Sequence, residues 1–197
     1  EDWRLWIDAM KDADVLADNA VTVAYSYIGP VLTHPIYFDG SIGKAKQDLY
    51  KTADEIDEQV DGVKAYVSVN KAVVTQSSAA IPIVPLYLSI LLKVMKEKNL
   101  HEDCIQQMYR LEHDRLCNPS GVPVDDRRLI RMDDYEMKTE VQQAVEKVWN
   151  EISQDNLAEA ADIDEYWKEF YEIFGFKIAG VDYDADCDIQ VQIPSLS

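Results

Sequence analysis

Glycine is scarce in this chain: only seven of its 197 residues are glycine, and the first of them is Gly29. Neither the G-x-G-x-x-G fingerprint of dinucleotide-binding folds nor a P-loop occurs in the sequence. Both motifs use glycine to bring the backbone close to a phosphate at a helix N-terminus. The sequence therefore excludes a complete nucleotide-phosphate site of either type within these 197 residues.

The chain also has few positively charged residues and no long apolar run. The chain has 19 Lys and Arg against 37 Asp and Glu, a net charge of −18, which disfavours nucleic acid and anionic membrane surfaces as partners. The longest apolar stretch, 81–92, is twelve residues with two prolines inside it, whereas a membrane-spanning helix needs about 20. We expect a soluble protein without a transmembrane segment. Lys44, Lys46 and Lys71 remain candidates for binding phosphates.

Cysteine is limited to three residues, Cys104, Cys117 and Cys187. An odd number of cysteines without a visible secretory signal is typical of reduced thiols in an intracellular compartment, either cytoplasm or mitochondrial matrix. His101, Cys104, His113 and Cys117 are potential metal ligands. Residues 104 and 113 lie on different turns of the predicted helix 101–117 and do not converge, so we expect no metal site.

The first half of the chain reads as strand, turn and helix. Residues 21–28 (VTVAYSYI) are β-branched and aromatic, which predicts a strand, and a Gly-Pro pair at 29–30 ends it. A helix is then expected from Ser41 or Gly43 to about residue 60, followed by a second strand at 65–69. With 47% hydrophobic residues, the whole chain 1–197 is long enough to bury one core, and we expect a single unit.

The second half is predicted to be helical. Pro85 opens a helix over 86–98, and Asp133 with Glu136 reads as a helix-capping pair. Two apolar stripes follow at helical spacing. One is Met137, Val141, Val145, Val148 and Ile152; the other is Tyr166, Trp167, Phe170, Tyr171 and Phe174, closed by Gly175.

Tyr37 and Lys46 are the candidate catalytic residues. Tyr37 is predicted to lie on a loop beyond the carboxyl end of the first strand, where open α/β sheets bind ligands. A phenol has an ordinary pKa of about 10, and a nearby cation favours the phenolate and lowers that value. Such a tyrosine can hydrogen-bond a developing oxyanion and release a proton to it. The spacing alone is weak support, since a core tyrosine beside a solvated lysine would look the same.

Several long blocks of sequence resemble one enzyme family. They are AYSYIGP at 24–30, IGKAK at 42–46, AYVSVNKAVVTQSSAAIP at 65–82, PLYLSILLKVMKEK at 85–98, IRMDDYE at 130–136 and FGFKIAGVDYDAD at 174–186. In order and over nearly the whole chain, they resemble the trans-2-enoyl-CoA reductases and the related large bacterial enoyl-[acyl-carrier-protein] reductases. Those enzymes carry a Tyr-x8-Lys pair, the spacing of Tyr37 and Lys46.

The resemblance implies a fold and a chemistry. The fold would be α/β: the C-terminal half of a Rossmann-like, doubly wound parallel sheet with additional packed helices. Residues 20–82 would form the catalytic segment, and 83–197 the substrate-pocket helices and a tail. The reaction would be NADH-dependent reduction of the trans-2 double bond of an enoyl-CoA or enoyl-carrier-protein thioester in fatty-acid synthesis.

The resemblance also implies roles for individual residues. Tyr37 would be the proton donor, and Lys46 would hold the nicotinamide ribose and keep the tyrosine acidic. Tyr27 would contact the substrate, although packing on the following helix is an equal alternative. Val73, Val74 and Thr75 would line the nicotinamide side with backbone groups, although an ordinary strand-to-loop core is the stronger interpretation of these three residues alone.

The sequence departs from the family pattern at positions that flank Tyr37. His34 stands where the family usually has Trp, Val31 where an acidic residue is expected, and Phe38 where another aromatic or polar residue is common. The family's glycine-loop half is also missing, and the chain begins at Glu1 without methionine. We interpret it as a split, cleaved or partial product whose NADH site needs that other half.

Two hypotheses remain open. The first is the catalytic half of an enoyl-thioester reductase, completed by another chain or by a missing segment. The second is a truncated, non-catalytic relative that acts as an accessory subunit of a larger complex. A half-sheet leaves an unpaired edge strand, so both hypotheses predict a protein partner or a missing segment that completes the sheet.

Overall fold

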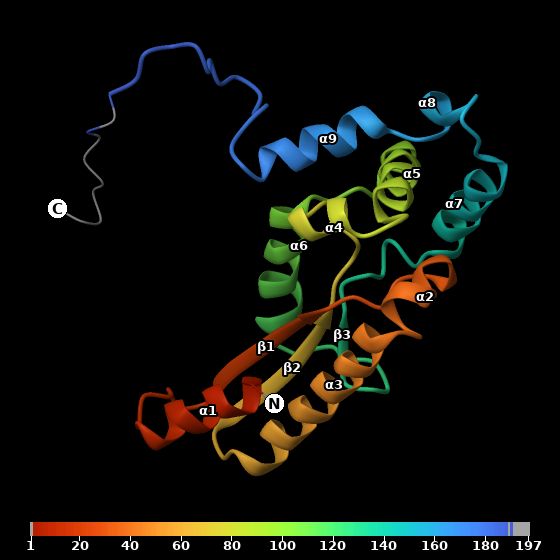
Figure 1. The fold of residues 1–197 in the computed structure, drawn as a ribbon. Helices are drawn as coiled ribbons and strands as arrows, with labels where there is room; N and C mark the ends of the chain where they lie inside the picture. Colours follow the sequence, from red (N-terminus) through yellow and green to blue (C-terminus); the bar gives the residue numbers. More distant parts are fainter. Residues whose placement is uncertain (1, 189, 191–197) are drawn as a thin grey trace.

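Three parallel strands form the sheet of this chain, in the order β1-β2-β3 (Figure 1). A computed structural model describes residues 2–188 and 190, so Glu1 and the end of the predicted tail lie outside the described residues. The strands are β1 (Ala20–Ser26), β2 (Val63–Val69) and β3 (Leu129–Arg131). Strand β1 pairs with β2 from Ala20↔Val63 to Ser26↔Val69, and β2 pairs with β3 from Val67↔Leu129 onward.

Helices connect the strands and gather beyond their carboxyl ends (Figure 1). In chain order they are α1 (Asp2–Asp12), a 3-10 turn (Val31–Thr33), α2 (His34–Tyr37), α3 (Ser41–Gln59), α4 (Gln76–Ala80), α5 (Val84–Glu97), α6 (Cys104–Arg110), a π-helical turn (Leu111–Leu116), α7 (Thr139–Glu151), α8 (Leu157–Ala160) and α9 (Ile163–Glu172). The predicted α/β class, a parallel sheet with additional packed helices, is confirmed. No helix in the described part of the chain is long and apolar enough to cross a membrane.

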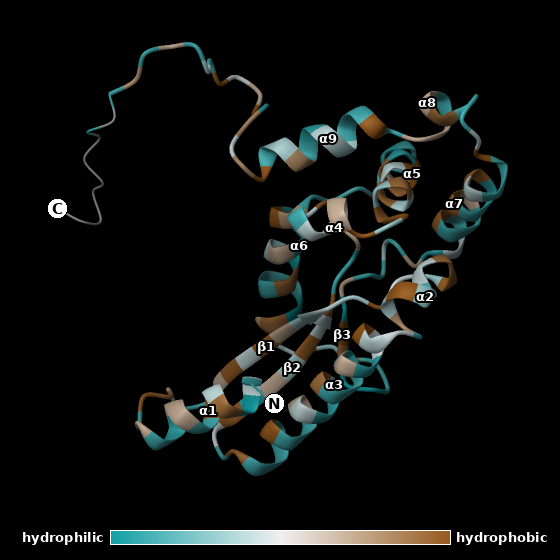
Figure 2. Cartoon of the chain, viewed as in Figure 1, coloured by the Kyte–Doolittle hydropathy of each residue, from teal (hydrophilic) through white to brown (hydrophobic). Residues whose placement is uncertain are grey.

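Strand β2 separates two apolar layers because successive side chains of a strand point to opposite faces. Its residues Val63, Ala65, Val67 and Val69 pack with Ile56 of α3 and Ile7 of α1. Tyr66 lies against the other layer, which contains Leu111, Ile130 and Met132. Hydrophobic and hydrophilic residues alternate along helix α3 (Figure 2), and its buried residues Ala53 and Ile56 pack against the sheet.

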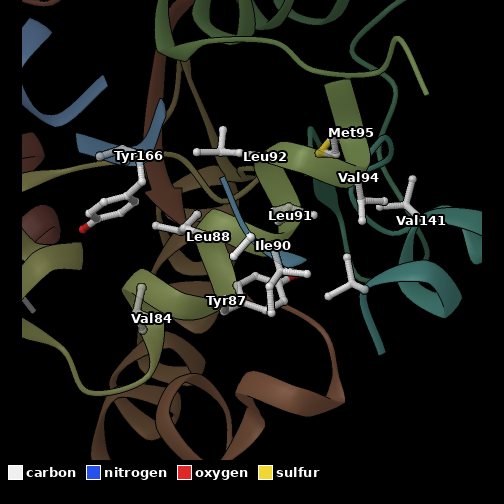
Figure 3. Packing of buried hydrophobic residues seen from close by; sticks show 13 residues of the cluster. Val84, Tyr87, Leu88, Ile90, Leu91, Leu92, Val94, Met95, Val141 and Tyr166 are labelled. Carbon is white, nitrogen blue, oxygen red and sulfur yellow. The ribbon is translucent and has the colours of Figure 1, made fainter. Parts of the chain in front are cut away.

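Helix α5 is the centre of a second, larger core. Nine of its 14 residues are buried, and the apolar ones pack against Val141 of α7 and Tyr166 of α9 (Figure 3). Val145 of α7 belongs to the same cluster. A helix that is apolar on nearly every side must be covered by other elements. Helices α7 and α9 provide this cover, and together with α4 they place a helical layer over the carboxyl ends of the strands.

The core around α5 predicts a large stability effect at Ile90, whose side chain is 0% exposed. Replacing Ile90 with alanine should lower the free energy of unfolding by about 2–5 kcal/mol, because it removes buried methylenes and leaves a cavity. Ile105→Ala is the matched control: Ile105 is 76% exposed, and its change should stay within about 0.5 kcal/mol. Urea denaturation of the two variants measures both values. Equal losses would show that Ile90 does not carry the core.

Some predicted boundaries change in the structure. The predicted helices 41–60 and 86–98 are confirmed as α3 and α5, each within two residues of its expected ends. The capping prediction for Asp133 and Glu136 was wrong: α7 begins at Thr139, and Met137 precedes the helix. Strand β3 was not anticipated, because a strand of three residues is too short to show a period.

Candidate active site

The site lies where the chain leaves β1. Tyr27 follows the strand directly, and the chain then turns through Gly29 into the 3-10 turn and α2. Tyr37 is the last residue of α2, a one-turn helix with proline in its first turn, so the prediction of a loop position for Tyr37 is corrected. Both tyrosines lie beyond the carboxyl end of a parallel strand, the edge at which open α/β sheets bind ligands.

Two glycines permit the close packing of this region. Gly29 has φ +75°, and a Cβ there would lie 2.3 Å from Thr33 Oγ1 and 2.7 Å from the Tyr27 hydroxyl oxygen. A Cβ at Gly43 would lie 1.8 Å from the Phe38 carbonyl oxygen. The first glycine lets the Tyr27 side chain fold back over the turn, and the second lets α3 begin directly against the end of α2.

A cavity of about 350 Å³ opens between these elements and α4 and α5. Its wall is largely apolar and aromatic, with a few polar groups from Lys46, Asn70 and Thr75. The lining residues are Tyr25, Ser26, Tyr27, Tyr37, Ile42, Lys46, Asn70, Lys71, Ala72, Val73, Thr75, Ser77, Ser78, Ile81, Val84, Tyr87 and Leu88. Such a combination is typical of a site for a small organic ligand.

Tyr27, Tyr37 and Lys46 come together at one end of the cavity. The Tyr27 and Tyr37 rings meet edge to face with their centroids 4.9 Å apart. Lys46 Nζ lies 4.9 Å from the centroid of the Tyr37 ring and 5.7 Å from that of Tyr27, and it donates a hydrogen bond to the Tyr27 carbonyl oxygen. The predicted neighbourhood of a phenol and an ammonium is therefore present, with the ammonium held by backbone.

Beneath the cavity lies a fully buried carboxylate, Glu136. Its Oε1 accepts hydrogen bonds from the Tyr27 hydroxyl at 2.9 Å and the Tyr87 hydroxyl at 2.6 Å. Its Oε2 accepts one from the Ala72 backbone N–H at 2.7 Å. The carboxylate thus ties together the ends of β1 and β2 and helix α5.

The segment that carries Glu136 is itself fixed by a buried guanidinium. Arg110 donates to Glu102, to both oxygens of Asp134 and to the Met132 carbonyl oxygen. Its guanidinium also lies 4.2 Å from the centroid of the Tyr135 ring. These contacts immobilise the turn after β3 and so set where the Glu136 carboxylate lies.

Burial controls the protonation of this cluster. Desolvation, followed by the charge of Glu136, raises the pKa of Tyr37 above its usual value. The same two causes raise the pKa of Tyr27 far higher, and desolvation also raises the pKa of Glu136. The prediction that Lys46 lowers the pKa of Tyr37 is corrected, since desolvation prevails and Tyr37 is a neutral phenol at neutral pH.

Lys46 should lose its proton at an unusually low pH. Half-burial without a carboxylate partner lowers the pKa of its ammonium to about 8, whereas a solvated lysine titrates at about 10.4. Carbon-13 NMR of the reductively methylated chain measures this value, and Lys46→Gln assigns the resonance by removing it. A Lys46 resonance that titrates at about 10.4, together with the exposed lysines, would contradict the expected desolvation.

Of the three other predicted cofactor residues, two line the cavity and one is buried in the core. The Val73 and Thr75 residues line the cavity, and Thr75 also caps α4 by accepting a hydrogen bond from the Ser78 N–H. Val74 is buried in the core around α5. Lys71 was a candidate for binding phosphate, but its ammonium is buried and donates to the Ala72 carbonyl oxygen.

Sequence reasoning missed two residues of the site. Tyr87 was treated only as part of an apolar helix, and Glu136 only as a helix cap. Both residues lie within sequence blocks that carry the family resemblance, and that position was the signal available in the sequence. The hydrogen bonds that a buried carboxylate needs become visible only in the structure. The described residues, 2–188 and 190, contain no group of three or more His, Cys, Asp or Glu side chains able to hold a metal ion.

Two family models match the chain. The trans-2-enoyl-CoA reductase catalytic region matches residues 1–117, and the enoyl reductase FAD binding domain matches residues 124–187. The Trans-2-enoyl-CoA reductase [NADH] of Ruminiclostridium cellulolyticum is 56% identical over 100% of this chain and 50% of its own length. The Enoyl-[acyl-carrier-protein] reductase [NADH] of Flavobacterium johnsoniae is 51% identical over 100% of this chain and 50% of its own.

Solved structures of trans-2-enoyl-CoA reductases also match this chain. The trans-2-enoyl-CoA reductase of Clostridium acetobutulicum in complex with NAD superimposes with a TM-score of 0.89 at 46% identity, over 95% of this chain and 49% of that one. The enzyme of Treponema denticola in complex with NAD gives a TM-score of 0.90 at 41% identity, over 94% and 47%. The chain therefore spans about half the length of the relatives it matches, and its fold is half of a Rossmann-like enoyl reductase fold.

Residues 124–187 contain few cations that could meet a flavin diphosphate, although the matching model is described as an FAD binding domain. Acidic residues greatly outnumber basic ones in this segment, and two of its arginines are already paired. Arg128 contacts Asp57 and Arg131 contacts Asp133, whereas a diphosphate needs cations or helix N-terminal N–H groups that are not already engaged. The segment instead supplies Glu136 and the helices that cover α5.

Proposed function

The chain belongs to the trans-2-enoyl-CoA reductase family, and from this we propose that it is the catalytic half of an NADH-dependent enoyl-thioester reductase. The observation that carries the proposal is the meeting of the Tyr37 phenol and the Lys46 ammonium at one end of an apolar cavity. Residues 1–197 would form one unit, the catalytic half of that enzyme. The bacterial names of its relatives support a cytoplasmic location.

Tyr37 would be the proton donor. Its hydroxyl would hydrogen-bond the thioester carbonyl oxygen, on which negative charge accumulates as the β-carbon is reduced. When bound, NADH supplies the hydride that forms the new C–H bond at the β-carbon and leaves as NAD⁺. The proton from Tyr37 neutralises the resulting enolate and ends on the α-carbon, so that the product is the saturated thioester. Solvent returns a proton to the phenolate.

Lys46 would bind the nicotinamide ribose and stabilise the phenolate once the proton has left. A cation 4.9 Å from the phenol ring centre is near enough to favour the charged form. The cavity wall at Val73 and Thr75 would contact the nicotinamide side, with Val74 contributing through its backbone, and Tyr27 would contact the substrate. Together these residues would hold the β-carbon of the substrate and the hydride-donating carbon of the nicotinamide in a largely apolar space from which water is displaced.

The dinucleotide phosphates would be bound elsewhere. The cavity offers one partly exposed cation, Lys46, since Lys71 is buried against backbone. A pyrophosphate is ordinarily held by a glycine-rich turn at a helix N-terminus, and relatives twice this length have room for that part. We therefore propose that a dinucleotide-binding half completes the sheet beside the edge of β1 that pairs with no other strand of the described residues.

A chimera tests the proposal. The chain replaces the matching half of the Ruminiclostridium cellulolyticum relative, which is 56% identical to it. Crotonyl-CoA and NADH deuterated at C4 are then supplied. We expect NADH oxidation at 340 nm and butyryl-CoA with deuterium on the β-carbon. The chain alone should show little turnover.

The label distinguishes the possible outcomes. Deuterium at the β-carbon supports direct hydride transfer, whereas butyryl-CoA without label would contradict it. A chimera that folds and binds NADH but produces no butyryl-CoA would favour a non-catalytic accessory subunit. Acyl carrier protein thioesters tested in parallel reveal which carrier the enzyme prefers.

A further inference from the structure

Glu136 is a carboxylate with 0% exposure that no sequence pattern assigned to the site. A buried carboxylate is costly unless hydrogen bonds and an opposite charge compensate it. Three donors point at it, from Tyr27, Tyr87 and the Ala72 backbone. The buried Lys71 ammonium supplies the opposite charge. Burial raises the pKa of Glu136, and these hydrogen bonds and the Lys71 charge act in the opposite direction by favouring the ionised form.

Four tyrosines line the cavity, Tyr25, Tyr27, Tyr37 and Tyr87, and the Glu136 carboxylate engages two of them. A tyrosine hydroxyl has one hydrogen to donate. Tyr27 and Tyr87 both donate theirs to Glu136 Oε1, at 2.9 and 2.6 Å. Within the described part of the chain, the Tyr37 hydroxyl makes no hydrogen bond. The Tyr37 ring contacts the Tyr27 ring and the Lys46 ammonium and packs against the apolar core around α5.

We propose that Glu136 is a positioning residue that binds the hydroxyl hydrogens of Tyr27 and Tyr87, so that of the two phenols beside Lys46 only Tyr37 can donate to the thioester oxygen. The fourth tyrosine of the cavity, Tyr25, is 59% exposed on β1. This inference rests on the proposed function and adds a reason why Tyr37, rather than Tyr27 or Tyr87, is the donor. It also changes the role of Tyr27, whose hydroxyl can then only accept a hydrogen bond from a ligand.

The charge of Glu136 supports the same role. Groups that face Tyr37 are Glu136, the Tyr27 ring and Lys46. Desolvation and, after it, the negative carboxylate raise the pKa of Tyr37 and so keep its proton in place until charge appears on the substrate. Glu136 also interacts with Lys71. Desolvation lowers the pKa of Lys71, the charges of Glu136, Glu102 and Glu169 act against this shift, and Arg110 adds to it.

Glu136→Gln tests the inference. The amide has one acceptor oxygen and two N–H donors, so it cannot accept from both phenols and the Ala72 N–H at once. Carbon-13 NMR of chain labelled at tyrosine Cζ is the first measurement, with resonances assigned by single Tyr→Phe variants. We expect slowly exchanging hydroxyl protons on Tyr27 and Tyr87 in the native chain and faster exchange of at least one in the variant, because a neutral amide oxygen is a weaker acceptor than a carboxylate. The pKa of Tyr37 should fall.

Activity of the chimera is the second measurement. Glu136→Gln should lower kcat by about 10²-fold, the cost of misplacing a reacting group by about 1 Å, and should move the basic limb of the kcat–pH profile to lower pH. Glu140→Gln, an exposed carboxylate of α7, is the matched control and should leave both unchanged. Tyr87→Phe keeps the carboxylate and should preserve the slowly exchanging Tyr27 proton and the Tyr37 titration.

The outcomes separate the two levels of the argument. An inactive native chimera would overturn the reductase proposal, whereas the NMR measurements on the chain would still test the hydrogen-bond assignment. If Glu136→Gln is folded and leaves kcat, the Tyr37 titration and both slow hydroxyl protons unchanged, the inference is overturned. Loss of the slow Tyr27 proton in Tyr87→Phe would also overturn it, because Glu136 would then not hold Tyr27 directly.

Discussion

Replacing Tyr37 with phenylalanine should lower kcat/KM of the chimera for crotonyl-CoA by about 10²–10⁴-fold, the usual contribution of a general acid. The substitution removes the oxygen that would donate to the thioester and leaves the ring in place. Because both the hydrogen bond to the oxyanion and the proton transfer occur as charge develops, the loss should fall mainly on kcat rather than on KM. Initial rates of NADH oxidation at 340 nm measure it.

The same substitution should leave folding nearly unchanged. The Tyr37 hydroxyl makes no hydrogen bond within residues 2–188, so its removal leaves no buried donor or acceptor unpaired. Thermal unfolding of Tyr37→Phe should therefore coincide with that of the native chain. Retained stability together with lost turnover would place Tyr37 in the chemistry rather than in packing.

Tyr109→Phe is the matched control for Tyr37→Phe. Tyr109 lies on α6, is 65% exposed and does not line the cavity. Its hydroxyl should be dispensable for turnover. If Tyr37→Phe retained the kcat/KM of this control, the proton would have to come from another group, and the proposed mechanism would be abandoned.

Local patterns were sufficient to predict much of the fold. The β-branched run at 21–28 and the apolar stripe of 41–60 each contain their own signal, and both elements form as β1 and α3. Strand β3 has three residues, so its identity depends on pairing with β2 rather than on any period of its own. Its contribution to the sheet could be found only once β2 was in place.

The site was predictable where it depended on short spacing and missed where it depended on distant contacts. Tyr37 and Lys46 are nine positions apart, at the end of α2 and in the first turns of α3, and a local motif contains both. The partners of Glu136 are 109, 64 and 49 positions away in sequence. From the sequence alone, Asp133 and Glu136 look like a cap, and nothing local distinguishes that arrangement from a buried hub.

Protonation was the property hardest to predict from sequence. The neighbouring lysine alone suggested a lowered pKa for Tyr37. The structure adds burial and the charge of Glu136, both of which raise that pKa. Burial depends on how α2, α3 and α5 pack around the cavity, which is a property of the assembled fold and not of any segment of the sequence.

Packing at Gly43 gives the second large prediction. Gly43 lies in the first turn of α3, three residues before Lys46. An added methyl group would lie 1.8 Å from the Phe38 carbonyl oxygen and 2.5 Å from its carbonyl carbon. Backbone atoms cannot rotate away as a flexible side chain can, so α2 and α3 must separate at the point that joins Tyr37 to Lys46.

Gly43→Ala should therefore lower kcat/KM of the chimera by about 10²-fold, because a displacement of about 1 Å between reacting groups costs that much. It should also lower the free energy of unfolding by about 1–3 kcal/mol, the usual cost of overpacking. Steady-state kinetics and urea denaturation measure the two effects. The chemistry of every side chain at the site is kept, so the loss would report geometry alone.

Gly40→Ala is the control that isolates this effect. Gly40 caps the same helix, but a Cβ there would lie 3.4 Å from the Ile36 carbonyl oxygen, a tolerable contact. Its backbone is also extended rather than left-handed, so alanine adopts it without strain. We expect near-native kcat/KM for Gly40→Ala. Equal activity in the two variants would show that the junction of α2 and α3 tolerates movement, and that the relative placement of Tyr37 and Lys46 does not limit the rate.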